Sequence, residues 1–291
     1  MISVIIPVRN MADTIGDQLQ ALSHQTFTGE WELIVADNGS TDGTQAICAR
    51  WIDRLPMLRL VDASARPGPS AARNIGAAAA RGSVFAFCDA DDAVFPGWLE
   101  HCVTASERHD HIAGALDAFS LNSFPVPAWE ARALYAPPFA MSFKPFAIGA
   151  NMVVSRRAFM DVGGFCESLS ASQDVDFSWR VQLAGYPLYF EPEAAVAKRY
   201  RRTVRAACRQ SMEWGIADIE LYRRFRQFGL EFPVGLGPLY SDCKGAFSRT
   251  SGLRIRVNSR TLLIALAFNL GRLLGCTNFG RSLVHRGRST D

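Results

Sequence analysis

Short apolar segments alternate with segments of helical periodicity along the first hundred residues. The apolar segments predict strands over residues 2–6, 32–36, 58–62 and 84–88. Helix-capping or helix-starting residues precede each intervening segment, so we expect helices from residue 15, over 44–51 and over 71–80. This order is typical of βαβ units. The pattern predicts an α/β fold with a Rossmann-like, mainly parallel central sheet flanked by helices.

The second part of the chain has a less regular pattern. Residues 118–146 are rich in proline, phenylalanine and alanine, which predicts a long and mobile loop region. A strand over 149–154 and a short helix over 156–162 are expected next. A further helix is predicted from Asp174 to Ala184, with Gly185 at its end.

Leucines at helical spacing predict one more helix near the C-terminus, between Arg260 and Arg272. The apolar stretch is too short and too interrupted to indicate a membrane span. Such a helix can lie on a membrane surface, pack against the rest of the chain, or contact a partner subunit. The pattern does not distinguish these three.

Composition and charge refine this picture. The 291 residues are 48% hydrophobic and 20% charged, as in ordinary globular proteins, so we expect a chain that is folded throughout. Residues 1–196 hold 13 basic and 22 acidic side chains, whereas residues 197–291 hold 18 and 6. The basic C-terminal part indicates either an anionic partner, such as a diphosphate, lipid headgroups or nucleic acid, or a solvated helical surface.

The seven cysteines are scattered and form no C-x-x-C pair, which fits a reducing compartment. Met1 leads directly into an apolar stretch without the basic start of a secretory signal. We therefore expect a cytoplasmic protein, with a peripheral location at the inner face of the membrane as an extension of that expectation.

Polar residues follow three of the predicted strands, and ligands in open α/β sheets bind at such strand ends. The three segments are Pro7-Val8-Arg9-Asn10, Asp37-Asn38-Gly39-Ser40 and Asp89-Ala90-Asp91-Asp92. The dense negative charge of the last segment is costly to bury without compensation. Mg²⁺ or Mn²⁺, which prefer oxygen ligands, would supply it and would also bridge donor phosphates. The alternative is an acidic turn that caps a helix near Pro96.

Four further residues are candidates for chemistry. Asp37 is placed to accept hydrogen bonds from a base or ribose at the strand edge. Arg73, at the first turn of an alanine-rich helix, is either a phosphate contact or an ordinary surface arginine. One of Asp174 and Asp176 can take a proton from an acceptor hydroxyl while the other stabilises a helix start. Spacing does not separate the two carboxylates.

The sequence lacks the motifs that are typical of several other enzyme classes. The five histidines show no metal-ligand spacing near these sites, and no G-x-S-x-G or Walker-type motif occurs. The first strand leads into Pro7-Val8-Arg9-Asn10 rather than a glycine-rich turn, which disfavours a Rossmann dehydrogenase.

The chain resembles the family 2 glycosyltransferases, inverting enzymes of the GT-A fold, over roughly residues 1–200. Six motifs occur in order. They are Val4-Ile5-Ile6-Pro7-Val8-Arg9-Asn10, Asp37-Asn38-Gly39-Ser40-Thr41-Asp42-Gly43-Thr44, Gly68-Pro69-Ser70-Ala71-Ala72-Arg73-Asn74-Ile75-Gly76, Asp89-Ala90-Asp91-Asp92, Gly163-Gly164-Phe165 and Gln173-Asp174-Val175-Asp176. The resemblance implies a catalytic domain over 1–200, with a nucleotide-sugar half (1–117) and an acceptor half (118–200), and a basic, mostly helical extension over 201–291.

The resemblance also implies roles for individual residues. Asp174 is the expected general base, and Asp91, with Asp89, is the expected ligand of Mg²⁺ or Mn²⁺. The expected donor-binding residues are Pro7, Val8, Arg9, Asp37, Arg73, Asp89, Ala90 and Asp91. The expected acceptor-binding residues are Asn151, Gly163, Gly164, Phe165, Gln173 and Trp179.

The sequence departs from the family pattern at three places. Asn38 and Gln173 stand where many relatives carry an aspartate and a glutamate, and the second change removes a carboxylate beside the expected base. Many relatives carry a histidine after the glutamate–aspartate pair that corresponds to Gln173-Asp174, and this histidine is missing here. We expect Lys198, Arg199 or Arg201 to replace it as a cation that faces the diphosphate.

The resemblance implies inverting transfer from a nucleotide-diphosphate sugar, of the UDP or dTDP type, to a hydroxyl of a glycan, a lipid-linked sugar or a small metabolite. A homo-oligomer is compatible with it, and no nucleic-acid partner is expected. The departures leave open a catalytically silent nucleotide-sugar-binding or membrane-associated module. A nucleotidyltransferase would need a glycine-rich first loop, which is lacking.

Overall fold

The computed structural model describes residues 1–55, 57–124, 126, 132–232 and 259–277. The strands are β1 (Ile2–Val8), β2 (Trp31–Asp37), β3 (Leu58–Asp62), β4 (Val84–Cys88), β5 (Ala93–Val94), β6 (His111–Asp117), β7 (Phe139–Ala140), β8 (Lys144–Pro145), β9 (Asn151–Ser155) and β10 (Tyr189–Ala197). The helices are α1 (Ile15–Ser23), α2 (Thr44–Trp51), α3 (Pro69–Ala79), α4 (Trp98–Ser106), α6 (Arg156–Asp161), α7 (Gln173–Leu183), α8 (Val204–Phe225) and α10 (Ser259–Gly275), with short 3₁₀ helices η1 (Arg132–Leu134) and η2 (Arg226–Phe228).

Within the described residues, one eight-stranded sheet has the order β3-β2-β1-β4-β9-β6-β10-β5. Strands β3, β2, β1 and β4 pair in parallel, which confirms the prediction from their alternation with helices. Strand β9 is antiparallel to both of its neighbours, β4 and β6. Strands β5, β6 and β10 were not predicted, and they complete the side of the sheet beyond β9.

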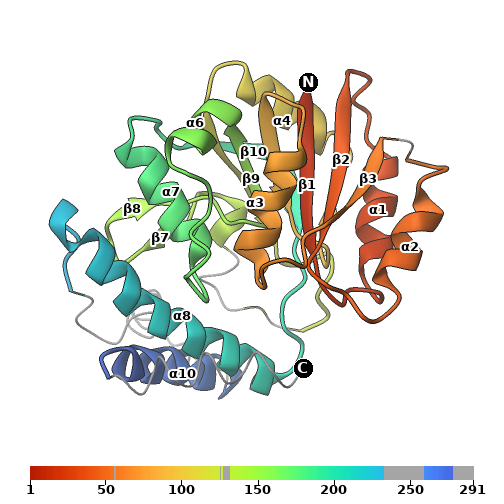
Figure 1. The fold of residues 1–291 in the computed structure, drawn as a ribbon. Coiled ribbons are helices and arrows are strands. Elements are labelled where there is room, and N and C mark those ends of the chain that lie inside the picture. Colours follow the sequence, from red (N-terminus) through yellow and green to blue (C-terminus); the bar gives the residue numbers. More distant parts are fainter. Residues whose placement is uncertain (56, 125, 127–131, 233–258, 278–291) are drawn as a thin grey trace, which may run out of the picture.

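Helices cover both faces of the sheet, as the α/β pattern predicts (Figure 1). Alternate residues of each strand point to opposite faces. In β1, Val4 and Ile6 pack with α1, α2 and α4, whereas Ile5 packs with α3, α6 and α7. The second face is rich in aromatic rings, and Phe165 and Phe177 stack there at 4.4 Å between ring centroids. The two apolar layers hold the strand ends in fixed positions.

The proline-rich region 118–146 is more ordered than a long loop in its described parts. It contains η1 and a two-stranded antiparallel pair of β7 and β8. Phe143 from the turn between these strands packs against Trp179 of α7. The region therefore forms a small structured layer over α7.

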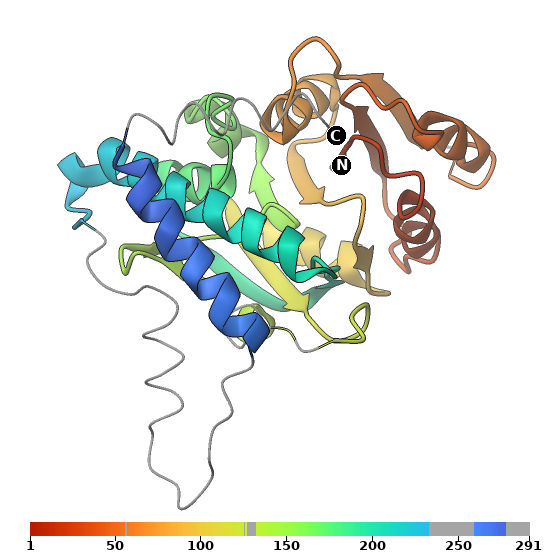
Figure 2. The same ribbon diagram turned by 90° about the horizontal axis from the view of Figure 1, so that it is seen from below.

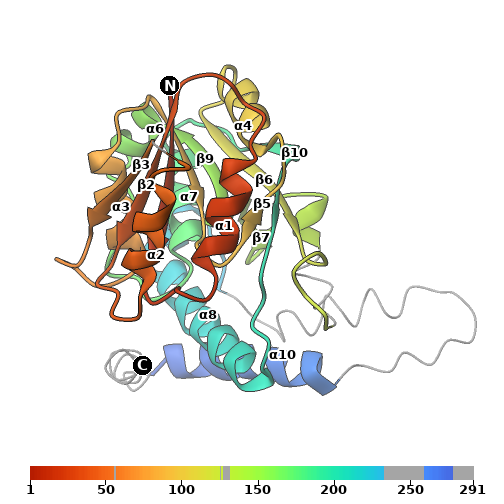
Figure 3. The ribbon, with the colours of Figure 1, turned by 90° about the vertical axis from the view of Figure 1, so that its right-hand side faces the viewer.

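Helices α8 and α10 lie beyond the carboxyl ends of the parallel strands (Figures 1 and 3). Leu221 and Phe225 of α8 pack with Val175 and Trp179 of α7. Helix α10 lies beside α8 on its outer side, as the view from below shows (Figure 2). No helix in the described part of the chain has both the length and the apolarity needed to cross a membrane.

Candidate active site

The aspartate cluster, defined here as Asp89, Asp91 and Asp92, lies between β4 and β5 at the carboxyl edge of the sheet. Strand β5 pairs antiparallel with the end of β10, at Val196 and Ala197, and this pairing brings the following residue, Lys198, to the cluster. Gln18 of α1 holds the turn, because its side chain donates to the Asp89 carbonyl at 3.1 Å and accepts from the Val94 amide at 3.0 Å. Gln18 was not predicted, since nothing in the sequence distinguishes it from a surface glutamine.

The three carboxylates differ in exposure. Asp92 is fully buried and accepts hydrogen bonds from the Arg199 amide at 2.7 Å and from Lys198 Nζ at 3.3 Å. The side chains of Asp89 and Asp91 are 27% and 16% exposed. Asp92 therefore anchors the turn, and the other two carboxylates face solvent.

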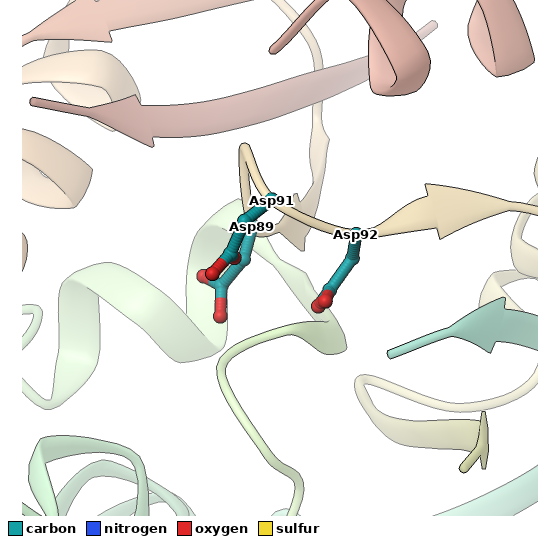
Figure 4. A group of neighbouring side chains, drawn as sticks. All are labelled: Asp89, Asp91 and Asp92. Carbon is teal, nitrogen blue, oxygen red and sulfur yellow. The ribbon is translucent and has the colours of Figure 1, made fainter. Parts of the chain in front are cut away.

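The cluster fits a divalent cation. One oxygen from each carboxylate lies within 4.8 Å of the others, and Asp89 and Asp91 point in the same direction (Figure 4). Such oxygen sets suit Mg²⁺ or Mn²⁺. The alternative of an acidic helix cap is wrong, because in the described chain α4 begins after Gly97 and no side chain caps it.

Three cations of the same chain approach the cluster. Arg73 Nη2 lies 2.7 Å from Asp89, Lys198 Nζ lies 3.6 Å from Asp89, and Arg201 Nη1 lies 3.7 Å from Asp91. The predicted replacement of the missing histidine by nearby cations thus has a structural basis at Lys198 and Arg201. The Arg199 guanidinium contacts no carboxylate of the cluster; it donates to the Asp91 carbonyl and pairs with Asp17, both at 2.9 Å.

The charges shift the carboxylates in different directions. Burial alone would raise the pKa of Asp89, but Arg73 and Lys198 outweigh it and lower that pKa. Burial, with the neighbouring charge of Asp89, raises the pKa of Asp91. Burial raises the pKa of Asp92 to about 7 although Lys198 opposes this shift. A cation bound among the three groups would relieve their mutual repulsion.

Arg73 is a buried residue in the second turn of α3, so the interpretation as a surface arginine is wrong. Its guanidinium lies 5.5 Å from the centroid of the Phe165 ring. The Nε atom is buried and has no hydrogen-bond partner among the described residues. An unpartnered buried donor of this kind is uncommon and marks this arginine as a candidate functional residue.

The structure distinguishes the roles that are open to Asp174 and Asp176. Asp176 is fully buried and pairs with Arg180 at 2.7 Å and with Arg224 at 2.8 Å, so its role is structural. Asp174 is partly exposed and accepts a hydrogen bond from the Gly149 amide at 3.0 Å. Burial raises the pKa of Asp174, the Gly149 amide and Arg73 oppose this, and Asp89 adds to it.

Gly149 lies next to both Asp174 and Arg73. Its amide binds Asp174, and a Cβ atom at this position would lie 3.1 Å from Arg73 Nη2. Arg73 in turn binds Asp89. A chain of contacts therefore runs from Asp174 to the aspartate cluster through Gly149 and Arg73.

The Gly163-Gly164-Phe165 segment lies beside α3. Gly163 and Gly164 have φ values of 73° and 72°, which favour glycine. Asn74, next to Arg73, binds both the amide and the carbonyl of Phe165, at 2.8 and 2.9 Å. The Phe165 ring is buried and the Gly164 carbonyl accepts a hydrogen bond from Arg180 at 2.8 Å, so most polar groups of this segment are bonded within the protein. This function of Asn74 was not predicted.

Two residues predicted to bind the acceptor lie inside the fold instead. Asn151 is 1% exposed, and its amide bonds Trp98 Nε1 and the carbonyls of Ala115 and Ala194. Trp179 is fully buried and donates to the Lys144 carbonyl at 3.0 Å. Both side chains use their polar atoms within the protein, so we correct these two assignments to structural roles.

Gln173, also predicted to contact the acceptor, is largely buried and donates to the Leu169 carbonyl at 3.2 Å. It thus helps to hold the start of α7, where Ser172 has a φ of 56°. The side chain that stands in place of the family's glutamate is directed into the protein and positions the helix that carries Asp174.

The end of β2 lies on the far side of β1 from the strand that leads to the aspartate cluster. Asp37 is buried and accepts hydrogen bonds from the Ser40 amide and from Gln45. Asn38 donates to the Arg66 carbonyl and accepts from the Gly68 amide, both at 2.8 Å. Asn38 therefore ties this strand end to the start of α3, a role that requires an amide donor.

The remaining predicted donor contacts lie at the adjacent end of β1. Pro7 and Val8 are paired with Ala36 and Asp37 of β2. Val8 is buried, whereas Arg9 is exposed. Ala90 is buried within the turn of the aspartate cluster.

Comparisons with known proteins agree with this geometry. Residues 3–163 match the model of glycosyl transferase family 2, and residues 87–274 match that of glycosyl transferase family group 2. The fold and the comparisons together define a glycosyltransferase with the GT-A fold. The chain belongs to glycosyl transferase family 2.

Among similar proteins, glycosyltransferase AglE of Haloferax volcanii is 29% identical over 94% of this chain and 95% of its own length. The pre-mycofactocin glycosyltransferase of Mycobacterium tuberculosis is 30% identical over 70% of this chain and 44% of its own length.

Solved structures share the fold. S. aureus TarS (1–349) superposes with a TM-score of 0.57 at 19% identity, over 99% of this chain and 87% of that one. The mannosyltransferase PcManGT of Pyrobaculum calidifontis superposes with a TM-score of 0.62 at 19% identity, over 99% and 79% of the two chains.

Proposed function

We propose that this glycosyltransferase moves a sugar from a nucleotide-diphosphate sugar to an acceptor hydroxyl with inversion at the anomeric carbon. One observation carries the proposal. Contacts run from Asp174 through Gly149 and Arg73 to Asp89, and they support a carboxylate base close to the residues that would hold the donor diphosphate.

The donor class is supported by the strand ends and by the structural neighbours. TarS has been solved in complex with UDP-GlcNAc, and PcManGT in complex with GDP-Man and Mn²⁺. We infer that Asp37, Arg73 and the end of β1 face the nucleotide of a UDP-type or dTDP-type donor. Arg73, Lys198 and Arg201 supply positive charge toward its diphosphate.

Asp91 and Asp89 would hold Mg²⁺ or Mn²⁺, because they are the exposed carboxylates of the cluster. When bound, the cation neutralises charge on the leaving diphosphate. Asp92 keeps the turn in place through Lys198 and the Arg199 amide.

Asp174 would act as the general base. Its carboxylate takes the proton of the acceptor hydroxyl as the hydroxyl oxygen forms a bond to the anomeric carbon. The bond to the diphosphate oxygen breaks on the opposite side of the sugar, and the diphosphate leaves with the bonding electrons. The configuration of the anomeric carbon is therefore inverted.

The acceptor would lie between Asp174 and the backbone of the Gly163-Gly164-Phe165 segment. A glycan, a lipid-linked sugar or a small metabolite remains the expected acceptor. The exposed leucines of α10, among them Leu266 and Leu270, are compatible with the expected peripheral membrane contact.

Donor-dependent release of nucleoside diphosphate tests this function. Purified protein, Mn²⁺ and a panel of nucleotide sugars are combined with glycan, lipid-linked and small-molecule acceptors. We expect release with one donor and its loss in Asp91→Ala, while the exposed control Asp53→Ala keeps it. Metal-dependent nucleotide binding without release for any acceptor would instead indicate a silent binding module.

A further inference from the structure

A groove of about 610 Å³ opens along the first turns of α8, next to the segment that follows β10. Its charged lining consists of Arg201, Arg205, Arg209 and Glu213, which carry a net charge of +2. Of these residues, the proposed transfer chemistry uses Arg201 alone. The rest of the charged lining therefore has no function in the proposed reaction.

The arginines of the groove are arranged on one side of the chain. Arg205 and Arg209 are four residues apart on α8, so they lie on the same helical face. Arg201 lies four residues before Arg205, outside the helix, and all three arginines are exposed. A guanidinium row of this kind matches the oxygen atoms of a phosphate or diphosphate better than it matches a single carboxylate.

One lining residue of the groove, Arg201, also contacts the aspartate cluster. Arg201 Nη1 lies 3.7 Å from Asp91, the residue proposed to bind the cation. The same arginine thus faces the donor site and contributes to the lining of the groove. A ligand in the groove would be adjacent to a donor diphosphate bound at the cluster.

The backbone at this end of the groove is held in place. Arg260 of α10 donates to the carbonyls of Arg201, at 2.5 Å, and Arg202, at 2.8 Å. The Thr203 side chain caps α8 by accepting from the Ala206 amide at 3.2 Å. These bonds fix the backbone that carries Arg201 and Arg205, which reduces the entropy lost when a ligand binds.

We propose that this groove binds a phosphate or diphosphate carried by the acceptor. The inference rests on the proposed function and narrows its acceptor to a phosphate-bearing molecule. The net charge of +2 complements a phosphate dianion, and the contact of Arg201 with Asp91 keeps this charge near the proposed donor site. A soluble glycosyl phosphate and a lipid-linked sugar share this chemistry.

Calorimetric titration with inorganic pyrophosphate, in EDTA so that no metal is bound, tests the groove directly. We expect saturable binding that weakens about tenfold in Arg205→Gln/Arg209→Gln. The control Arg50→Gln/Arg108→Gln removes the same charge from exposed positions outside the groove and should bind like wild type. Absence of saturable binding, or equal affinity in both double variants, would overturn the proposal.

A second titration separates the groove from the donor site. UDP with Mn²⁺ should bind Arg205→Gln/Arg209→Gln as tightly as wild type and should fail to bind Asp91→Ala. If UDP binding depends on Asp91 but pyrophosphate binding ignores the groove arginines, the groove inference fails while the proposed function stands. If neither UDP nor dTDP binds wild type in the presence of Mn²⁺, the proposed function fails.

A third titration identifies the source of the phosphate. A short-chain prenyl diphosphate that binds more tightly than pyrophosphate, and loses that advantage in the exposed-face variant Leu266→Ser/Leu270→Ser, would identify a lipid-linked acceptor. Equal affinity of the two probes would identify a soluble phosphate. The control Ile52→Ser/Met160→Ser changes comparably exposed apolar residues elsewhere on the protein.

Discussion

At the scale of single residues, the aspartate cluster is balanced by charges of its own chain. The carboxylates of Asp89, Asp91 and Asp92 face Arg73, Lys198 and Arg201, so the site is close to neutral before any ligand binds. A divalent cation alone would add two positive charges. A donor diphosphate would offset them, so we expect the cation and the donor to strengthen each other's binding.

Lys198→Met should therefore bind Mn²⁺ at least about tenfold more tightly than wild type in the absence of nucleotide, since a cation 3.3 Å from Asp92 is removed. Its affinity for UDP should fall. Titration of Mn²⁺, followed by the electron paramagnetic resonance signal of the free ion, measures the first effect. Lys144→Met serves as the control, and an unchanged Mn²⁺ affinity in Lys198→Met would contradict the charge balance.

The pH dependence of transfer follows from Asp174. The base must be ionised, and burial raises its pKa above the ordinary aspartate value, so the rate should fall as the pH drops through this raised pKa. Arg73 lowers the pKa of Asp174, so Arg73→Met should move the acidic limb to higher pH. The midpoint of the pH–rate profile is the measurement, with Arg50→Met as control. A midpoint that stays in place would show that Arg73 does not act on the base.

The sequence identifies candidate site residues, but it does not identify the distant residues that contact them in the fold. Asp174 and Asp176 are two positions apart at one helix start, and the ion pair of Asp176 with Arg224 joins segments that are distant in sequence. The burial of Arg73 depends on Phe165 and Asp89 in the same way. Such contacts carry no local signal, so spacing leaves these alternatives open.

At the scale of elements, close backbone contact joins α10 to α8. A Cβ atom at Gly271 would lie 2.1 Å from the Met212 carbonyl, and one at Gly215 would lie 2.0 Å from the Phe268 carbonyl. Arg272 also pairs with the buried Asp218 at 2.7 Å. The two helices therefore form one unit, and α10 braces the start of α8 through Arg260.

Gly271→Ala should lower the free energy of unfolding by about 1–3 kcal/mol, because the helices must move apart to admit the methyl group. Gly16→Ala in α1 is the matched control, since its new methyl group meets nothing within 4 Å. Alanine favours a helix over glycine, so the control should be neutral or stabilising. Urea denaturation compares them, and a Gly271→Ala protein as stable as wild type would refute the close packing.

The elements most accurately predicted are those with the simplest pattern. Strands β3 and β4 have the predicted bounds: β4 is a short apolar run between polar turns, and β3 has three apolar residues in five and ends at Asp62. Strand β10 was missed, since Glu191, Pro192 and Glu193 interrupt its apolar pattern and its pairing with β6 shifts register there. Strand β6 was missed as well, although five of its seven residues are apolar or glycine.

At the scale of the whole molecule, the charge asymmetry of the sequence corresponds to a division of the structure. The acidic part of the chain forms the sheet and the aspartate cluster, and the basic part contributes α8 and its groove. The α/β class and the helical extension were predictable from periodicity and composition. The position of the extension, across the carboxyl ends of the strands, depends on the packing of Leu221 and Phe225 against α7.

The central claim is that Asp174 acts as the general base and does not take part in donor binding. The most direct test is single-turnover nucleoside diphosphate release by Asp174→Asn, with Asp53→Asn as control and donor binding measured in parallel. We predict unchanged donor affinity and a rate lower by about 10²- to 10⁴-fold. Release by Asp174→Asn at the wild-type rate would contradict the account.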